Sequence, residues 1–287
     1  LHLLSRRQRQ MCIRDRYEES MALLEESGIK IPGGKRTLLV PARNFPVEVL
    51  FLRDDDIPES VASGVADVGI VGLNEVMEKR CPVGILKKLG FGKCRLSLAI
   101  PQDIDYLDRN WFSGKKIATS YPGILSDYLH KNGIVSDIHV ITGSVEIAPG
   151  IRLADAIFDI VSSGSTLVSN RLKEVETVVE SEAVLIGTDS ISPEKRGILD
   201  ELLFRFDSVQ AADDKKYILM NVPQKKLNDV LSVLPGIKSP TVMPLADKEW
   251  CSVHTVLDEK CFWEIINRLK TAGAEGILVL DIEKMIL

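Results

Sequence analysis

A run of small, mostly hydroxylated residues follows an apolar stretch near the middle of the chain. Residues 155–167 read DAIFDIVSSGSTL, so that Ser-Ser-Gly-Ser-Thr comes directly after the apolar positions. Glycine frees the backbone, and the N–H groups and hydroxyls around it can then converge on a phosphate at the start of a helix. A solvated turn has the same composition, because Ser and Gly also favour turns for local backbone reasons. The run is therefore a candidate phosphate-binding loop, with a plain turn as the alternative.

Two aspartates, Asp155 and Asp159, stand four residues apart in the stretch before this loop. In a strand, residues i and i+4 point to one face of the sheet. Two solvent-facing acids at a strand end would show the same spacing. A carboxylate beside a phosphate loop can instead accept hydrogen bonds from ribose hydroxyls or organise Mg²⁺. The functional interpretation is a sugar-phosphate site in which Asp159 contacts the ribose and residues 162–166 bind the 5′-phosphate.

Such a loop needs a strand before it and a helix after it. The apolar run 155–161 predicts the strand, and residues 167–175, LVSNRLKEV, predict the helix. In open α/β sheets, ligands bind beyond the carboxyl ends of the strands. This placement favours the phosphate-binding interpretation over a plain turn.

The rest of the chain alternates between strands and helices. The alternation begins at Tyr17, and a second unit of the same kind begins near Pro101. It predicts an α/β protein with a mostly parallel sheet and helices on both faces. From Lys216 the order changes to βαββαβ, the ferredoxin-like arrangement of a small autonomous domain. This last part contains no cluster that suggests catalysis.

Composition narrows the class of protein. The chain has 287 residues, enough for about two or three domains, and its net charge of −5 argues against a surface that coats nucleic acid. No apolar run approaches the ~18–20 residues of a membrane span. The 5 cysteines include no C-x-x-C pair, and the 4 histidines have no metal-ligand spacing. We therefore expect a cytoplasmic protein with reduced thiols, no zinc site, and neither nucleic-acid nor membrane partners.

The first sixteen residues, LHLLSRRQRQMCIRDR, differ from the rest of the chain. They are rich in arginine, show no strand or helix period, and lack the long apolar segment of a signal peptide. They look like translated adapter sequence of the kind that contaminates assembled environmental reads. We interpret residues 1–16 as a non-native or disordered segment.

Residues 146–167 resemble the signature of the ATP phosphoribosyltransferase family, the enzymes that open histidine biosynthesis. The family pattern has a Glu, a Gly six residues later, and then D-[LIV]-x-x-[ST]-G-x-T-[LM]. The chain departs from this pattern at Arg152, where the family usually has Gly. The resemblance extends from about Ser20 to Leu287 and includes the blocks RDDDIPESVASGVADVGIVGLN, GFGKCRLSLAIP and GILVLDIEKM. The signature residues that match are Glu146, Asp159, Ile160, Ser163, Gly164, Thr166 and Leu167.

The resemblance implies a fold and a domain organisation. It implies a two-lobed catalytic part similar to periplasmic binding proteins, followed by a ferredoxin-like regulatory domain like that of the family's long form. Lobe I would comprise residues 17–100 plus about 179–208, lobe II with the phosphate loop residues 101–178, and the regulatory domain residues 212–287. A homo-oligomer, from dimer to hexamer, would be expected.

The same resemblance implies a reaction between ATP and 5-phosphoribosyl 1-pyrophosphate, which gives N1-(5-phosphoribosyl)-ATP and pyrophosphate. The adenine N1 displaces pyrophosphate at the anomeric carbon through a transition state with oxocarbenium character. Orientation and charge stabilisation then matter more than proton transfer. Mg²⁺ would neutralise the leaving pyrophosphate, with no protein ligands to the metal assigned. Histidine would inhibit by binding to the regulatory domain.

The implied roles divide the candidate residues into four groups. The catalytic group, which faces the sugar, is Glu146, Asp155 and Asp159. The phosphate group is Ser162, Ser163, Gly164, Ser165 and Thr166. The nucleotide group is Gly72, Leu73, Asn74, Arg95, Ser120 and Tyr121. The histidine group is Leu234, Ser239, Thr241 and Ala274.

Several of these residues have an equally simple structural interpretation. Tyr121 can be an ordinary aromatic residue at a strand end, and each member of the histidine group can belong to a plain turn. For Asp54, Asp55 and Asp56 we prefer a charged loop in which Asp56 caps a helix, with a ligand role for Asp54 or Asp55 as the alternative.

Two other functions compete with the enzyme. A solute-binding module shares the two-lobed architecture, but it predicts a secretory signal and no phosphate loop, and this sequence shows the opposite on both points. An inactive or purely regulatory relative is favoured by the start of the chain. The family begins with a strand and a short basic Gly-Arg loop, where this chain has MCIRDRYEES. One central strand and a phosphate-facing basic residue would then be missing, although Arg14 or Arg16 could substitute by charge.

Overall fold

The chain forms two compact units, residues 1–201 and residues 202–287, which are described separately. The computed structural model describes residues 2–6, 11–32, 38–235 and 240–286, with the backbone alone described for residues 2–6 and 11–15. Within the described residues, no helix has the length and apolar character needed to cross a membrane.

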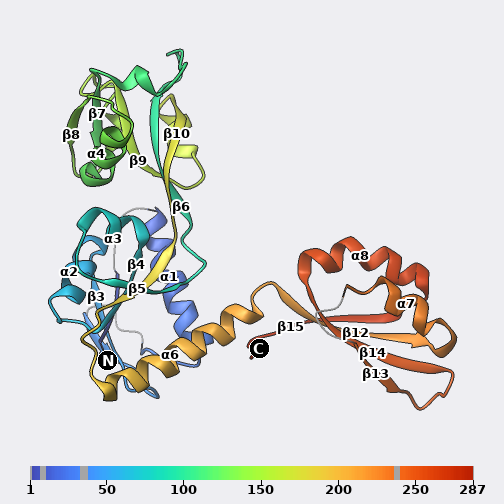
Figure 1. The fold of residues 1–287 in the computed structure, drawn as a ribbon. Coiled ribbons are helices and arrows are strands. Elements are labelled where there is room, and N and C mark those ends of the chain that lie inside the picture. The colour runs from blue at the N-terminus through green and yellow to red at the C-terminus, as the bar shows by residue number, and fades with distance from the viewer. Residues whose placement is uncertain (1, 7–10, 33–37, 236–239, 287) are drawn as a thin grey trace. The chain divides into compact units, whose positions relative to one another are not determined.

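The first lobe of unit 1 is built on a six-stranded sheet (Figure 1). Its strands are β1 (His2–Arg6), β2 (Leu39–Pro41), β3 (Glu48–Leu52), β4 (Val68–Gly72), β5 (Gly84–Lys88) and β11 (Ala183–Gly187), and its helices include α1 (Met11–Glu26), α2 (Ile57–Ala62) and α3 (Leu73–Lys79). The strand order is β2-β3-β1-β4-β11-β5. β1 is parallel to β3 and β4, whereas β11 is antiparallel to β4 and β5 because it returns from the second lobe. The sheet of this lobe is therefore mixed, with β1, β3, β4 and β5 running in one direction and β2 and β11 in the other.

The beginning of the chain is part of this sheet. β1 lies between β3 and β4, with Leu3 opposite both Val49 and Val68, and α1 begins at Met11. Strand pairing uses the backbone, so a segment without a clear side-chain period can still form a ladder. For residues 2–6 and 11–16 the interpretation as disordered is corrected accordingly, as is that of a sheet without its central strand; residues 1 and 7–10 lie outside the described residues. That residues 1–16 are not native stays a prediction.

The two strands β4 and β11 lie next to each other inside the sheet of the first lobe. Every residue of both strands is buried, as is typical of strands covered on both faces. Ile57 and Val61 of α2 pack on them with no exposed surface. The carboxyl end of β4 is thereby fixed at Gly72, which is also the N-cap of α3.

The second lobe of unit 1 is built on a five-stranded sheet with the order β10-β6-β9-β7-β8. The strands are β6 (Cys94–Pro101), β7 (Lys116–Thr119), β8 (Asp137–Val140), β9 (Ala156–Val161) and β10 (Leu172–Ser181), and the helices include α4 (Pro122–Lys131) and α5 (Ser165–Ser169). β7 is parallel to β8 and β9, and β6 is antiparallel to β9 and β10. The core contains the fully buried rings of Phe112 and Phe158.

The segment after the phosphate loop differs from the prediction. The helix expected over residues 167–175 is wrong, because α5 ends at Ser169 and β10 begins at Leu172. The valines and the alternation of polar and apolar residues in LKEVETVVES suit an edge strand better than a helix. β6 and β10 both belong to the second sheet, so the lobe boundaries lie near residues 94 and 181 rather than 100 and 179.

Unit 2 begins within α6 (Pro193–Ala212) and continues as a four-stranded antiparallel sheet with the order β13-β14-β12-β15. The strands are β12 (Lys215–Pro223), β13 (Thr241–Pro244), β14 (Trp250–Asp258) and β15 (Glu275–Asp281), and the helices include α7 (Leu227–Val233) and α8 (Glu259–Ala272). α7 and α8 cover one face, where Met220, Val253 and Leu269 are fully buried (Figure 1). The βαββαβ prediction, and with it the two-lobed α/β fold followed by a ferredoxin-like domain, is confirmed.

Candidate active site

The hydroxyl-rich loop lies where it was predicted, between the end of β9 and the start of α5. Gly164 has φ 78°, a left-handed conformation that favours glycine. The hydroxyl oxygens of Ser163 and Ser165 lie 3.0 Å apart, and both side chains are exposed, as is Thr166. Leu167 is buried and anchors the loop to the lobe. Ser162 is exposed as well, so the loop presents four exposed hydroxyl side chains at the carboxyl end of a strand.

Asp159 lies three positions before the first residue of this loop, Ser162, and faces the same side of the sheet as Ser97, its partner in the β6–β9 register. Its Oδ1 accepts a hydrogen bond of 2.8 Å from the N–H of Ile160. Burial raises the pKa of Asp159 to about 6, although that hydrogen bond lowers it, and the negative charge of Glu146 raises it further. Two of the three predicted catalytic acids, Asp159 and Glu146, therefore lie within electrostatic reach of each other.

Asp155 is not brought to the loop. Its Oδ2 accepts a hydrogen bond of 2.8 Å from the N–H of Lys116, at the start of the neighbouring strand β7. Asp155 and Asp159 do share a face, but four residues of strand separate them by roughly 13 Å. Asp155 therefore lies at the opposite end of β9 from the loop. Its predicted contact with the ribose has no support in the geometry.

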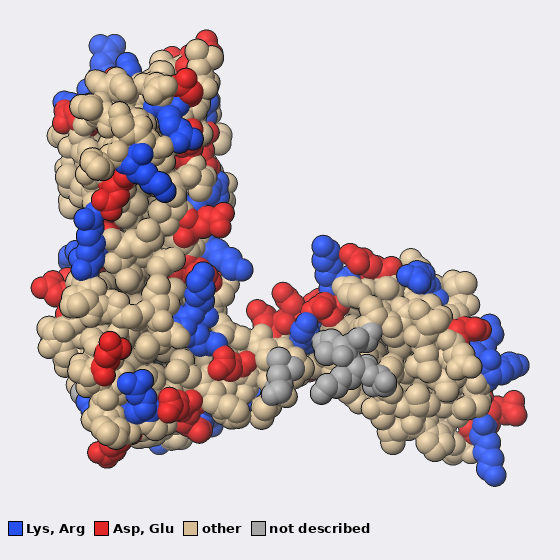
Figure 2. Space-filling model, in the orientation of Figure 1, with Lys and Arg blue, Asp and Glu red and all other residues tan. Residues whose placement is uncertain are grey.

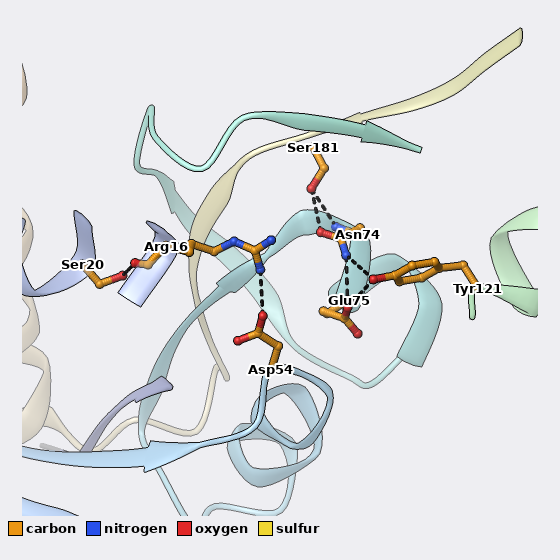
Figure 3. Close-up of polar contacts among 7 residues, drawn as sticks. All are labelled: Arg16, Ser20, Asp54, Asn74, Glu75, Tyr121 and Ser181. Carbon is orange, nitrogen blue, oxygen red and sulfur yellow. Dashed lines mark hydrogen bonds and ion pairs between the residues drawn. The ribbon is translucent and has the colours of Figure 1, made fainter. Parts of the chain in front are cut away.

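A buried polar cluster lies at the carboxyl end of β4 (Figure 3). Ser181 Oγ donates to Asn74 Oδ1 at 2.9 Å and accepts from the N–H of Asn74 at 3.0 Å. Asn74 Nδ2 donates to Glu75 Oε1 at 3.1 Å and to Tyr121 Oη at 3.2 Å, and Asn74 has no exposed surface. The Tyr121 hydroxyl donates to Glu75 Oε1 at 2.9 Å. The cluster joins α3 of the first lobe to the residues that follow β7 in the second.

Burial also sets the protonation of this cluster. Burial raises the pKa of Glu75. It also raises the pKa of Tyr121, and the neighbouring Glu75 carboxyl raises the Tyr121 pKa further. The Tyr121 phenol therefore stays a proton donor across the physiological range. This geometry favours the structural interpretation of Tyr121, and it adds Glu75, which the sequence analysis missed.

A second contact between the lobes involves the start of α4. The carboxylate of Glu78 accepts hydrogen bonds from the N–H groups of Gly123 at 2.8 Å and Ile124 at 2.9 Å. Negative charge at a helix N-terminus is favourable because the free N–H groups carry partial positive charge. Ser120, from the nucleotide group, donates its hydroxyl hydrogen to the carbonyl of Ile141 at 2.8 Å.

Arg16 is buried beside the β4–α3 turn, with 4% of its surface exposed (Figure 3). Its Nη1 donates to Asp54 Oδ2 at 3.1 Å, and its Nε is buried with no hydrogen-bond partner. A Cβ on Gly72 would lie 2.6 Å from Arg16 Nη1, so glycine is required there for close approach. Asp54 is thus a partner of Arg16, while Asp56 occupies the N-cap of α2 without a side-chain cap bond.

A cavity of about 570 Å³ lies beside the loop and the ends of β6 and β10. Leu73, Lys93, Arg95, Ser162 and Ser181 are among the residues that line it. Lys88, also on its wall, forms an ion pair of 3.1 Å with Glu182. The cavity therefore combines apolar side chains, hydroxyls, three basic residues and the acidic residues Glu180 and Glu182 next to the candidate phosphate loop.

Known proteins are similar to this chain over most of its length. The sequence model described as ATP phosphoribosyltransferase matches residues 53–208, and the one described as HisG, C-terminal domain, matches residues 212–284. The ATP phosphoribosyltransferase of Bacteroides fragilis is 70% identical over 271 residues, which cover 94% of this chain and 96% of that protein.

The chain belongs to the ATP phosphoribosyltransferase family. A more distant relative, the ATP phosphoribosyltransferase of Cytophaga hutchinsonii, is 57% identical over 269 residues, 94% of each chain. A solved structure, the ATP phosphoribosyl transferase (HisG:HisZ) complex from Thermotoga maritima, superposes with a TM-score of 0.60 at 24% identity, covering 72% of this chain and 98% of that chain, and supports the fold. The C-terminal domain places the chain in the long form of the family.

Within the family signature, Arg152 replaces the usual Gly and keeps a left-handed backbone with φ 60°. The turn before β9 therefore forms despite the substitution. The left-handed conformation strains the backbone of a residue that, unlike glycine, has a Cβ.

The predicted histidine group is spread over unit 2. Leu234 follows α7, Thr241 opens β13, and Ala274 is buried between α8 and β15. β13 and β15 are the two edges of the sheet, so Thr241 and Ala274 are three strand spacings apart, roughly 14 Å. Ser239 lies outside the described residues. Leu234 packs against the core cluster that contains Ala274, so of the described members the structure sets apart Thr241 alone.

Proposed function

We propose that this chain transfers the phosphoribosyl group of 5-phosphoribosyl 1-pyrophosphate to N1 of ATP, releasing pyrophosphate, as the first step of histidine biosynthesis. The observation that carries the proposal is the exposed loop of residues 162–166 at the end of β9, the strand that carries Asp159, whose carboxyl lies in the electrostatic field of Glu146. Its hydroxyls and backbone N–H groups suit a phosphate, and the two carboxylates suit a sugar. Family membership supports the same reaction.

In this proposal the loop binds the 5′-phosphate, with Ser163, Ser165 and Thr166 supplying hydroxyl donors. The ionised Asp159 accepts hydrogen bonds from the ribose hydroxyls and fixes the sugar ring. As adenine N1 approaches the anomeric carbon and the bond to pyrophosphate breaks, positive charge develops on the ring. The carboxylates of Asp159 and Glu146 stabilise that charge. The protein mainly orients the two substrates.

The nucleotide is proposed to occupy the cavity next to the loop. Leu73 offers an apolar surface for the adenine, and the exposed Lys93 offers a positive charge for the triphosphate. Gly72 and Asn74 shape the turn below Leu73. On the face shown in Figure 2, basic and acidic side chains are interspersed, so the binding of an anion depends on local groups such as these.

The proposed metal is Mg²⁺. The described residues contain no group of three or more His, Cys, Asp or Glu side chains that could hold a metal ion. They therefore fit an ion held mainly by substrate phosphates. Bound in this way, Mg²⁺ would neutralise charge on the pyrophosphate.

Unit 2 is proposed to be a histidine sensor in a cytoplasmic homo-oligomer of between two and six chains. The match of the family's C-terminal domain supports a regulatory role. The sheet face opposite α7 and α8 supports assembly, because Tyr217, Leu278 and Leu280 are 37%, 56% and 49% exposed there. Histidine should lower the turnover of the full chain without competing with ATP, and purely competitive inhibition would contradict a separate sensor.

The reaction is tested by mixing the full chain with ATP, 5-phosphoribosyl 1-pyrophosphate and Mg²⁺ and identifying the products by mass spectrometry. The expected result is phosphoribosyl-ATP and pyrophosphate in equal amounts, formed only when both substrates are present. Saturable binding of both substrates with no product would instead favour the inactive relative.

A further inference from the structure

The side chain of Arg95 connects three segments of the second lobe. Its Nε donates to Glu174 Oε1 at 2.6 Å and its Nη2 donates to Glu174 Oε2 at 2.5 Å, a two-pronged ion pair between β6 and β10. Its Nη1 donates to the carbonyl oxygen of Ser162 at 3.1 Å. Ser162 is the first residue of the phosphate loop. We call this arrangement of Arg95, Glu174 and Ser162 the fork.

Glu174 is itself held in place. Its Oε1 also accepts hydrogen bonds from Ser97 Oγ at 2.8 Å and from Thr177 Oγ1 at 3.1 Å. β10 has a bulge directly after Glu174, which re-aims side chains at that point of the ladder. The hydrogen bonds from Arg95 lower the pKa of Glu174 to about 2, so the carboxylate stays charged wherever the protein is folded. Arg95 therefore faces a rigid anionic partner.

The fork fixes the direction of the first peptide of the loop. A trans peptide is planar, and its C=O and N–H groups point in opposite directions. Because the carbonyl of Ser162 points to Arg95, the N–H of Ser163 points away from Arg95. The loop's first N–H is thus held in one orientation by a side chain that is 67 positions away in sequence.

We propose that Arg95 and Glu174 are positioning residues for phosphoribosyl pyrophosphate: the fork holds the Ser162 peptide so that the Ser163 N–H is available to the 5′-phosphate. This inference rests on the proposed function. It replaces the nucleotide contact predicted for Arg95 from the sequence. The guanidinium charge is matched by the bidentate carboxylate, so the fork acts through geometry more than through charge.

Geometry of this kind requires arginine. Lysine carries the same charge, but it has a single nitrogen and cannot contact both carboxylate oxygens and a carbonyl in one plane. Ser97, which supports Glu174, pairs in register with Asp159, so the fork adjoins the proposed ribose site as well.

The test compares Arg95→Lys and Glu174→Gln in the full chain. Glu176→Gln is the matched control, because Glu176 lies on the same strand and accepts a hydrogen bond from Tyr106 at 2.7 Å, outside the fork. Binding of 5-phosphoribosyl 1-pyrophosphate and of ATP is measured separately by calorimetry, with melting temperatures as a check on folding. Both fork variants should weaken phosphoribosyl pyrophosphate binding by about tenfold or more, the effect of one hydrogen bond to a charged group.

ATP binding should change by less than about twofold in Glu174→Gln, because Glu174, unlike Arg95, is not among the residues that line the proposed ATP cavity, and the control should match wild type for both ligands. If Arg95→Lys does not fold, Glu174→Gln decides alone, because it keeps the shape of the side chain. Wild-type affinity in a folded fork variant, or equal weakening in Glu176→Gln, would overturn the inference. A wild-type chain that binds no phosphoribosyl pyrophosphate would instead contradict the proposed function, and the inference with it.

Discussion

The phenolic oxygen of Tyr121 lies 2.9 Å from Glu75 Oε1, joining the segment after β7 in one lobe to α3 in the other. Asn74 completes the contact, with Nδ2 within hydrogen-bond distance of both groups. Because the cluster is buried, these polar groups hydrogen-bond to one another instead of to solvent water. The contact between the lobes is therefore polar, directional and sensitive to the loss of a single oxygen.

Tyr121→Phe should lower the free energy of unfolding by about 1–3 kcal/mol, because it leaves buried polar atoms of Asn74 and Glu75 without the hydroxyl. Urea denaturation monitored by circular dichroism measures the change. Tyr128→Phe is the control, because the Tyr128 hydroxyl makes only a long hydrogen bond of 3.4 Å, to Glu176 in the same lobe. If both variants lost the same free energy of unfolding, the contact between the lobes would contribute no more to stability than the hydrogen bond within one lobe.

Arg16→Met should lower the free energy of unfolding by about 3 kcal/mol or more, because the buried carboxylate of Asp54 loses its guanidinium partner. Arg53→Ala, an exposed neighbour of Asp54, should change stability by no more than about 0.5 kcal/mol. Chemical denaturation compares the two. If both variants were equally harmless, the ion pair between Arg16 and Asp54 would not hold α1 to the turn that follows β3.

Asp159→Asn should abolish most turnover and yet stabilise the fold at pH 8. Burial raises the pKa of Asp159 from 3.8 to about 6, so its contribution to stability is present below pH 3.8 and lost as the pH rises through 6. At pH 8 the variant removes a poorly solvated charge and should gain about 1–3 kcal/mol, a difference that fades at pH 4. Thermal unfolding at the two pH values measures this gain.

The same ionisation should shape the activity of the wild-type protein. Only the charged form of Asp159 accepts hydrogen bonds from both ribose hydroxyls, so kcat/KM for phosphoribosyl pyrophosphate should fall as the pH drops below about 6. A profile that stays flat down to pH 5 would remove Asp159 from the sugar site.

Arg152→Gly should raise the free energy of unfolding by about 1 kcal/mol, because it relieves a side chain held at φ 60° before β9. Arg152→Ala retains a Cβ and should show no gain, which separates backbone strain from the loss of the arginine charge. Denaturant midpoints of the two variants provide the measurement. A larger gain for alanine than for glycine would point to charge as the cause.

Local sequence patterns predicted much of this molecule. The hydroxyl run after an apolar strand indicated the loop of residues 162–166, and the order of elements after Lys216 indicated the ferredoxin-like domain. Both features depend on residues that are close together in the sequence. The placement of Asp155 failed because strand periodicity gives the face of a sheet but not the end at which a side chain lies.

Long-range contacts lay beyond such patterns. Nothing near Arg95 in the sequence identifies Glu174 as its partner, and the Val-rich segment from Leu172 was mistaken for a helix because it follows a helix start. β1 was missed for another reason. Its pairing with β3 and β4 uses backbone groups that every residue possesses, so composition gave no signal.

The most direct test of the account is a calorimetric titration of the folded full chain with 5-phosphoribosyl 1-pyrophosphate, comparing wild type with the double variant Ser163→Ala/Thr166→Ala. Ser169→Ala is the control, because its hydroxyl donates to the carbonyl of Ser165 inside α5. Two hydrogen bonds to a charged group are lost in the double variant, each worth about 1.5–3 kcal/mol, so the affinity should fall at least tenfold while the control stays at the wild-type value. An unchanged dissociation constant in the double variant would contradict the assignment of this loop as the phosphate site.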